Sequence, residues 1–345
     1  MRKTRPSMVH HISVGVLAWA IFLGLPDPFA PSRAIAAPMA SATGELQAAR
    51  DFEQVRQFAK SGGERLWAGY GAAPFGLLLV LPTQEILLCQ NEVPAGFVRS
   101  DTPEAGCDRS VRPRSKLPGN LLAAMGVFGP RETIVMGTPE NADRTYPEWL
   151  RTILHEHFHQ WQTSRPSYQD AVRALGLADN DTSMSWMLDF PVPYGDVALG
   201  DAFAQASRSL AAVVGAKDSK DFKAKLRNYL AARNAFTAAA GERNWRYLEF
   251  QLWQEGVARW TEIRLGRIYP DPEVRKAAAA LEDETRAALA SPDLKRQRRV
   301  FVYAYGAAEA MLIDRCNPSW REHYFETLSL KTSLETAARA CGVAF

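Results

Sequence analysis

The segment His155-Glu156-His157-Phe158-His159 constrains the fold of this chain more than any other. In an α-helix, positions four residues apart lie only about 40° apart around the axis, so His155 and His159 point the same way. Two imidazoles in this arrangement can bind one zinc ion, while Glu156 stands beside a metal-bound water molecule. Three of the six histidines of the chain fall within this segment. We therefore expect a helix here that carries a Zn²⁺ site.

The residues around this segment predict where the helix begins and ends. Thr145 and Glu148 fit a capping box, and Pro147 is tolerated because the first amides of a helix have no partner within the helix. Apolar residues then recur at intervals of three and four and predict a buried stripe: Leu150, Ile153, Leu154, Phe158 and Trp161. His157 falls within this stripe, so we expect a hydrogen-bonded core histidine there rather than a metal ligand. The break before Pro166 ends the predicted helix.

The first 36 residues resemble a secretory signal peptide. Arg2, Lys3 and Arg5 precede a largely apolar run over residues 12 to 25, which is short for a membrane-spanning helix, and small residues follow. Cleavage after Ala36 would leave 37 basic and 37 acidic residues, a balance that argues against nucleic-acid binding. We expect a secreted or periplasmic protein with no stable membrane insertion after cleavage.

Cysteine usage agrees with export. The chain has four cysteines, and an even number in an exported protein predicts two disulfides. Proximity in the sequence favours Cys89 with Cys107 and Cys316 with Cys341.

The order of the predicted elements indicates an α+β fold. After a helix near residues 44 to 60, the short apolar segments predict strands at residues 75–81, 85–89 and 133–136. Alanine-rich segments later predict helices at residues 199–215, 219–240, 273–290 and 299–315. We expect a small, mainly antiparallel β region with a helix over residues 41–141, and a mostly helical, zinc-binding region over residues 142–345. The turn-rich residues 91–120, with several arginines, predict an exposed loop with a solvated charged face.

A catalytic zinc ion requires a third protein ligand and an open position for water. Residues 253 to 262 have the order Trp-x-Glu-Gly-x-Ala-x-aromatic-x-Glu. This order resembles the second metal-binding helix of the gluzincin zinc metallopeptidases, which have aminopeptidase-like and thermolysin-like catalytic domains. The resemblance implies that Glu255 is the third zinc ligand, with Glu249 as the alternative. Gly256 would let two helices approach closely, and Glu262 would either orient a ligand histidine or lie on the surface.

One spacing departs from the gluzincin pattern. Glu255 follows His159 by 96 residues, a longer interval than in the better-known branches of the family. A helical insertion over residues 167–240 would fill it, and we expect its loop at residues 187–194 to form a wall of the substrate cleft.

Two further segments bear on catalysis. Tyr303-Ala304-Tyr305-Gly306 resembles the Tyr-x-x-Gly helix of aminopeptidase-like gluzincins, which implies that Tyr303 donates a hydrogen bond to the oxyanion, with Tyr305 as the alternative. Residues 137–141 superficially resemble the strand that binds the free amine in aminopeptidases. Proline in place of methionine, and a shorter distance to His155, favour a plain turn instead. Endopeptidase and exopeptidase activity both remain open.

These residues together predict an exported zinc metallopeptidase acting on peptide or protein substrates. His155, His159 and Glu255 would hold the zinc ion, and Glu156 would act as the general base toward an activated water. The alternatives are a zinc-binding protein of the same fold without catalytic activity, and a zinc hydrolase that acts on a non-peptide amide.

Overall fold

The computed structural model describes residues 42–90, 92–100, 106–129, 131–181, 184–217 and 219–344. The predicted signal peptide lies outside these residues. Within the described part of the chain, no helix is both long enough and apolar enough to cross a membrane.

A single mixed sheet of six strands forms one side of the molecule, in the order β3-β4-β2-β1-β6-β5. The strands are β1 (Leu77–Val80), β2 (Gln84–Leu88), β3 (Val98–Arg99), β4 (Arg109–Pro113), β5 (Leu122–Met125) and β6 (Thr133–Gly137). β1 pairs with β6 in parallel, and the other four pairings are antiparallel. With the helices described next, this sheet confirms the predicted α+β class.

The prediction of an exposed loop over residues 91–120 is wrong in part, because β3 and β4 lie within it. β4 pairs with β2, and this pairing places Arg112 opposite Glu85. The Arg112 guanidinium lies 2.6 Å from the Glu85 carboxylate, whose side chain is fully buried. Part of the predicted solvated charge run therefore neutralises a carboxylate inside the fold.

Helices make up most of the remaining chain. The α-helices are α1 (Ala42–Phe58), α2 (Glu64–Leu66), α3 (Tyr146–Thr163), α4 (Tyr168–Ala174), α5 (Trp186–Asp189), α6 (Val197–Val214), α7 (Ser219–Ala240), α8 (Glu242–Gln251), α9 (Val257–Arg267), α10 (Pro272–Ala290), α11 (Leu294–Gln297), α12 (Phe301–Cys316) and α13 (Lys331–Ala340). π-Helical turns at Ala59–Gly63 and Leu252–Gly256 and 3₁₀ turns at Arg298–Val300 and Pro318–His323 interrupt them. The predictions of α1, α6, α7, α10 and α12 are confirmed to within a few residues.

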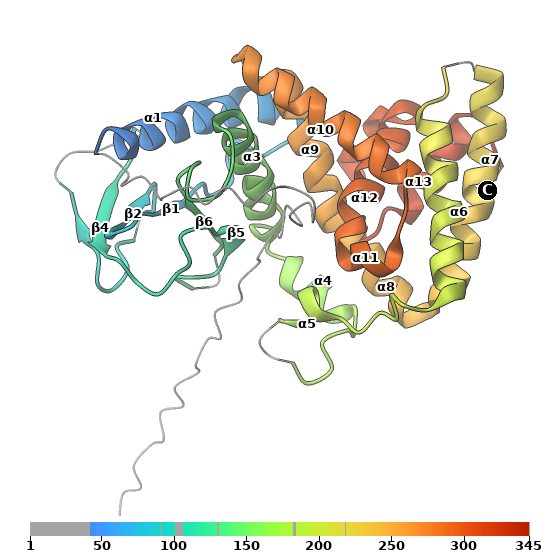
Figure 1. Ribbon diagram of the computed structural model, residues 1–345, viewed down its shortest axis with the longest axis horizontal. Helices are drawn as coiled ribbons and strands as arrows, with labels where there is room; N and C mark the ends of the chain where they lie inside the picture. Colours follow the sequence, from blue (N-terminus) through green and yellow to red (C-terminus); the bar gives the residue numbers. More distant parts are fainter. Residues whose placement is uncertain are drawn as a thin grey trace, which may run out of the picture.

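α3 occupies the middle of the molecule, between the sheet and the bundle that contains α9, α10 and α12 (Figure 1). It contacts β5, β6 and α1 on one side and α9 and α10 on the other. Two buried hydrogen bonds tie it to the sheet side: Trp149 Nε1 donates to the Gly137 carbonyl at 2.8 Å, and Tyr70 Oη donates to the Leu154 carbonyl at 2.7 Å. Because both faces of α3 are covered, its polar side chains must find partners inside the protein.

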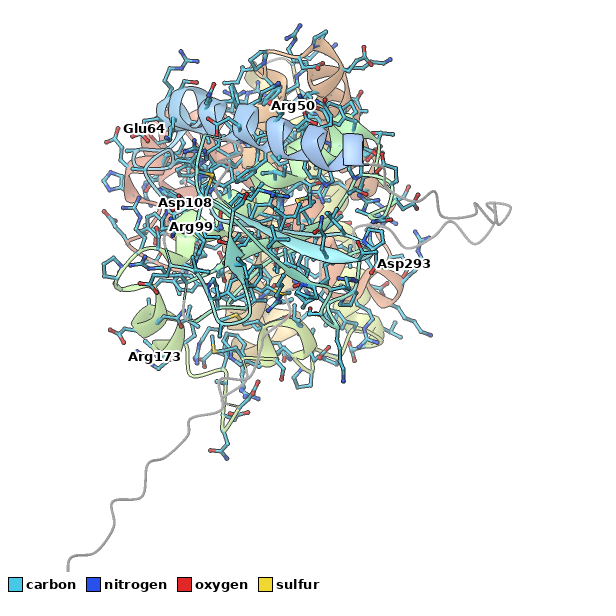
Figure 2. All side chains as sticks on the ribbon, turned by 90° about the vertical axis from the view of Figure 1, so that its left-hand side faces the viewer. Arg50, Glu64, Arg99, Asp108, Arg173 and Asp293 are labelled. Carbon is cyan, nitrogen blue, oxygen red and sulfur yellow. A yellow bond between two sulfur atoms is a disulfide. The ribbon has the colours of Figure 1, made fainter. Side chains whose placement is uncertain are left out.

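Seen from the sheet side, α1 runs across the top of the strands (Figure 2). The labelled charged residues Arg50, Glu64, Arg173 and Asp293 project from the periphery in this view. They are all exposed, as expected for charged side chains.

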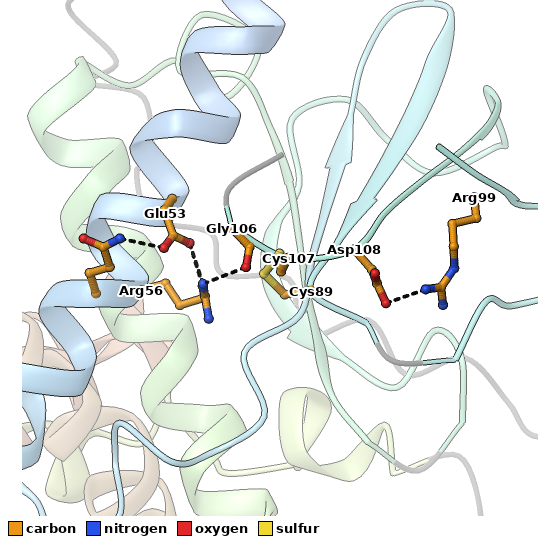
Figure 3. Close-up of a disulfide and its surroundings, with 8 residues drawn as sticks. Glu53, Arg56, Cys89, Arg99, Gly106, Cys107 and Asp108 are labelled. Atoms are coloured by element: carbon orange, nitrogen blue, oxygen red, sulfur yellow. Dashed lines mark hydrogen bonds and ion pairs between the residues drawn. A yellow bond between two sulfur atoms is a disulfide. The ribbon is translucent and has the colours of Figure 1, made fainter. Parts of the chain in front are cut away.

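Both predicted disulfides are present: Cys89 with Cys107, and Cys316 with Cys341. The first closes the loop between β2 and β4 beside α1, where Arg56 Nη2 lies 3.5 Å from the Gly106 carbonyl (Figure 3). The second joins the end of α12 to the end of α13. Each bridge limits the freedom of the unfolded chain and so stabilises the fold by about 2–4 kcal/mol.

Candidate metal centre

The helix that carries the two histidines begins where the sequence predicts. Thr145 is the N-cap of α3, and its amide donates to the Glu148 carboxylate at 2.9 Å. Pro147 occupies the first turn. The helix ends at Thr163, before Pro166. These boundaries place His155 and His159 in the middle of a rigid, fully covered helix.

His155, His159 and Glu255 form a buried group that can hold a metal ion. The two Nε2 atoms are 3.3 Å apart, and Glu255 Oε2 lies 3.2 Å from the Nε2 of His159 and 3.7 Å from that of His155. Ligand atoms around a tetrahedral zinc ion with bonds of about 2.0–2.1 Å are about 3.3 Å apart. The triangle therefore fits three vertices of a tetrahedral site. Two imidazoles and one carboxylate are also ligands that zinc accepts.

Glu255 reaches the histidines through an irregularity in the helix. α8 passes into the π-helical turn Leu252–Gly256, which leads directly into α9. Such turns are rare and often occur at functional sites, because the wider turn changes the direction of the side chains that follow. A side chain on Gly256 would collide with the backbone of Gly306 in α12. Gly256 therefore permits a close helix approach, as predicted, but the prediction that the approach joins the two metal-binding helices is wrong, because the partner of Gly256 is α12.

The other ring nitrogens of the two histidines are supported differently. His159 Nδ1 lies 2.8 Å from Gln162 Oε1. His155 Nδ1 lies 3.2 Å from Glu262 Oε2, at ion-pair distance but without hydrogen-bond geometry. Such contacts fix the ring orientation of a metal-binding histidine. Gln162 was not among the predicted site residues, although its position three residues after His159 on one helix was a usable signal.

Glu262 is fully buried, which excludes the surface position considered for it. Arg151 binds one of its oxygens, and Arg259 Nη1 lies 3.5 Å from the other. Burial by itself would raise the pKa of Glu262, but Arg259 and Arg151 outweigh it and bring that pKa to about 2. A permanent negative charge therefore faces His155.

The three candidate ligands perturb one another strongly. Burial would lower the pKa of His159, but the Glu255 carboxylate more than compensates and raises that pKa to about 9. The pKa of His155 is also raised, against burial, by Glu255 and Glu262. The pKa of Glu255 is lowered well below its ordinary value, again against burial, by His159 and His155. The Glu255 carboxylate thus favours positive charge at this point. A bound divalent cation would supply that charge in place of the protons, which both imidazoles must release to act as ligands.

Glu156 bridges the edge of the sheet and the metal site. The amide of Ala124, in the edge strand β5, donates to Glu156 Oε2 at 2.7 Å. Glu156 Oε1 is buried and has no hydrogen-bond partner. Burial raises the pKa of this carboxyl above its ordinary value. One oxygen is thus fixed by the protein, while the other remains available to a bound water or substrate.

Tyr303 lies beside the same group. Its ring centroid is 6.0 Å from that of His155, and its buried hydroxyl has no hydrogen-bond partner. Arg299, one helical turn earlier, places its guanidinium 5.9 Å from the Tyr303 ring centroid without hydrogen-bond geometry to the hydroxyl. Arg299 Nη1 lies 3.3 Å from Glu255 Oε1 and thereby supports the carboxylate on the side away from the histidines. Arg299 was not among the predicted site residues.

Glu249 and Tyr305, the alternatives considered for the third metal ligand and for the oxyanion donor, belong to a separate buried cluster. We call it the Arg233 cluster, and it consists of Tyr229, Arg233, Glu249, Tyr305 and Glu309. Arg233 Nη2 donates to Glu249 at 2.8 Å, and Arg233 Nε donates to Glu309 at 2.6 Å. The Tyr229 hydroxyl donates to Glu309, and it lies at hydrogen-bond distance, 3.3 Å, from the Tyr305 hydroxyl. Glu249 and Tyr305 are therefore engaged elsewhere, whereas Glu255 and Tyr303 face the histidines.

His157 is a core residue, as its place in the apolar stripe suggests. Its ring stacks on Phe75 at 3.6 Å, and its two nitrogens lie 3.0 Å from Gln160 Oε1 and from the Tyr70 carbonyl. Burial lowers the pKa of His157 to about 4, so it is neutral at physiological pH.

The structure also describes the two other segments considered around the site, residues 137–141 and 187–194. Residues 138 to 143 form a turn after β6, as expected for the Pro-Glu-Asn sequence. In the expected wall at residues 187–194, Met187 accepts a hydrogen bond from Tyr247 at 2.9 Å, and Phe190 stacks on the Tyr247 ring at 4.5 Å. Its packing against α8 holds this loop in place.

No protein-family model, curated protein or solved structure matches this chain. The likeness to gluzincins therefore depends on the residues of the metal centre. What the structure establishes is an α+β protein with two disulfides and a buried His-His-Glu group of suitable geometry for a metal ion.

Proposed function

We propose that the protein is an exported, gluzincin-type zinc metallopeptidase that hydrolyses peptide bonds. The observation that carries this proposal is the convergence of His155, His159 and Glu255 beside an unengaged oxygen of Glu156. Three ligands leave a fourth tetrahedral position open for water, as in catalytic rather than structural zinc sites.

The residues have complementary roles in this proposal. His155, His159 and Glu255 would hold zinc, which when bound supplies a Lewis acid that lowers the pKa of a coordinated water to about 7. Glu156 accepts the proton of the attacking water at Oε1 and returns it to the leaving amine. Tyr303 donates its hydroxyl to the developing oxyanion, a type of interaction that contributes about 3–4 kcal/mol in other hydrolases.

The disulfides support the export part of the proposal. Disulfides persist in oxidising compartments and are rare in the cytosol. Two of them in a chain that opens with a leader-like sequence favour a periplasmic or extracellular site of action.

The test compares the wild type with Glu156→Gln. Glutamine preserves the size of the side chain but cannot accept the proton, so we expect turnover to fall by at least about 100-fold while the metal content is unchanged. The measurements are elemental analysis and digestion of a peptide library with and without a chelator. Glu140→Gln, in the exposed turn after β6, is the matched control and should retain full activity.

Each outcome separates the candidate functions. Full activity in Glu156→Gln would remove the base assignment. Stoichiometric metal with no cleavage of any peptide would indicate a non-catalytic zinc-binding protein. Chelator-sensitive cleavage of cell-wall amides, but not of peptides, would indicate a hydrolase of another amide.

A further inference from the structure

We infer that the protein has a second binding site, for a phosphate group carried by a small organic molecule. The site is a pocket of about 420 Å³ in volume between α9, α10 and α12. Trp260 and Arg264 of its lining each stand two residues from Glu262, which faces the metal centre. Positions two apart are separated by about 200° around a helix, so the pocket lies on the opposite side of α9 from the metal centre.

Positive charge dominates the lining of this pocket. Four arginines contribute to it, against two carboxylates: Arg264, Arg267, Arg286, Arg315, Glu282 and Asp314. Both carboxylates already have a close cationic partner. Arg286 donates to Glu282 at 2.8 Å, and Arg321, from outside the lining, binds Asp314. The pocket therefore presents an excess of cations that its own acids do not neutralise.

Arg264 and Arg267 supply the available charge. They are three residues apart on α9, and their side chains are 54% and 51% exposed. Among the described residues, the acidic neighbour of each lies 3.9 Å away: Asp314 for Arg264 and Glu282 for Arg267. Ion pairs this long and exposed contribute little, so a bound anion can replace them at low cost.

Arg315 and Arg286 are already positioned by residues at the end of α6, just after it and in α7. Arg315 Nη1 donates to the Ala216 carbonyl at 2.7 Å, and its guanidinium packs 4.0 Å from the Phe222 ring centroid. Arg286 Nη1 lies 3.4 Å from the Val214 carbonyl. Because these contacts restrict the two side chains before binding, less conformational entropy is lost when an anion is bound.

The apolar residues of the lining indicate what kind of molecule carries the phosphate group. Trp260, Ile263 and Met311 form an apolar part of the wall, and Trp260 is almost fully buried. Arginine guanidinium groups match phosphate oxygens through paired hydrogen bonds. The ligand class that fits both parts is a phosphate monoester with an apolar or aromatic substituent, free or as a lipid headgroup.

The experiment measures binding to the purified protein, as isolated, by calorimetry at fixed ionic strength. Phenyl phosphate is the probe, with inorganic phosphate and phenol as its two halves. We expect phenyl phosphate to bind more tightly than either half. The double variant Arg264→Ala/Arg267→Ala should raise its Kd by roughly tenfold or more, because two charge-assisted contacts are lost. Arg173→Ala/Arg243→Ala, at exposed arginines elsewhere, is the matched control.

A flotation assay with phosphatidic acid vesicles distinguishes the source of the phosphate. Vesicle binding that disappears in Arg264→Ala/Arg267→Ala assigns the site to a lipid headgroup, and tight phenyl phosphate binding without flotation assigns it to a free ligand. Equal binding by both double variants, or none by the wild type in either assay, overturns the inference. Neither assay measures metal content or peptide cleavage. Binding of the phosphate ligand can therefore be established or refuted independently of the proposed peptidase activity.

Discussion

The metal centre and the Arg233 cluster are both buried groups of glutamate, tyrosine and cationic side chains, but they use their polar atoms differently. In the Arg233 cluster, no buried side-chain nitrogen or oxygen of the five described residues lacks a partner. In the metal centre, Glu156 Oε1, Glu255 Oε2 and the Tyr303 hydroxyl are all without a hydrogen bond. A buried polar atom without a partner costs about 1–3 kcal/mol. Unsatisfied atoms that converge on one point therefore indicate where a ligand belongs.

Two glutamates in one continuous helical segment illustrate the difference. Glu249 in α8 accepts hydrogen bonds from Arg233 and, at 3.0 Å each, from Ser329 Oγ and the Leu330 amide. Glu255 follows six residues later, inside the π-helical turn, and faces His159. The Glu249 carboxylate is fully hydrogen-bonded within the protein, whereas one oxygen of Glu255 remains available to a cation.

The largest effect is expected on stability, when the Arg233 cluster loses its cation. Arg233→Met leaves Glu249 and Glu309 without their shared cation, and breaking a buried ion pair in this way costs about 3–5 kcal/mol of unfolding free energy. Burial already raises the pKa of Glu309. The folded state therefore holds this proton more tightly than the unfolded state, and stability falls as pH rises through the raised pKa.

Without the Arg233 cation, the folded state should hold carboxyl protons of the cluster still more tightly. The Arg233→Met variant should therefore lose more unfolding free energy, relative to the wild type, at pH 8 than at pH 5. Urea unfolding at both pH values measures it, and metal content should not change. Equal stability of the variant and the wild type would mean that Arg233 does not neutralise Glu249 and Glu309 in the folded protein.

A second pair of variants tests the two glutamates directly. Glu255→Gln should weaken metal binding by more than about 100-fold, since supporting residues alone account for 10- to 100-fold. Glu249→Gln should leave the metal affinity unchanged. Competition with a chromophoric chelator measures both constants. The assignment would pass to Glu249 if their effects were reversed.

Tyr303 and Tyr305 allow the same comparison, with smaller expected effects. Tyr303→Phe should lower kcat by about 100-fold with little change in KM, as expected for a lost oxyanion donor. Its stability should not fall, because the hydroxyl has no partner to lose. Tyr305→Phe should leave kcat unchanged and reduce stability slightly, because it removes a bond to Tyr229. Steady-state kinetics and thermal unfolding separate these outcomes.

The smallest effect is expected from the support of His155. Glu262→Gln should lower the metal affinity about tenfold, because the amide presents no negative charge to the ring. Glu148→Gln, which removes the other carboxylate close to Arg151, is the control and should leave the metal affinity unchanged. An effect on metal affinity as large as that of Glu255→Gln would mean that Glu262 itself binds the ion.

Local patterns were the predictable part of this structure. The capping residues before Tyr146, the histidine spacing and the pairing of nearby cysteines depend on short stretches of chain, and all three predictions are confirmed. β4 and β5 were missed because Arg109–Pro113 is charged and Leu122–Met125 is rich in alanine, so neither has strong strand propensity. Pairing with β2 and β6 overrode that weak local preference.

The sequence by itself determined which side chains can bind a metal ion and, through helical periodicity, that His155 and His159 act together. Tertiary structure placed Glu255, which the resemblance had favoured over Glu249, beside them. It alone decided that Gln162 and Arg299 support the site and that Arg233 closes a second cluster. The physical reason is that helical spacing relates residues within one turn or two, whereas contacts between α3, α9 and α12 depend on how separate helices pack. The π-helical turn before Gly256 and the close approach to Gly306 set that packing.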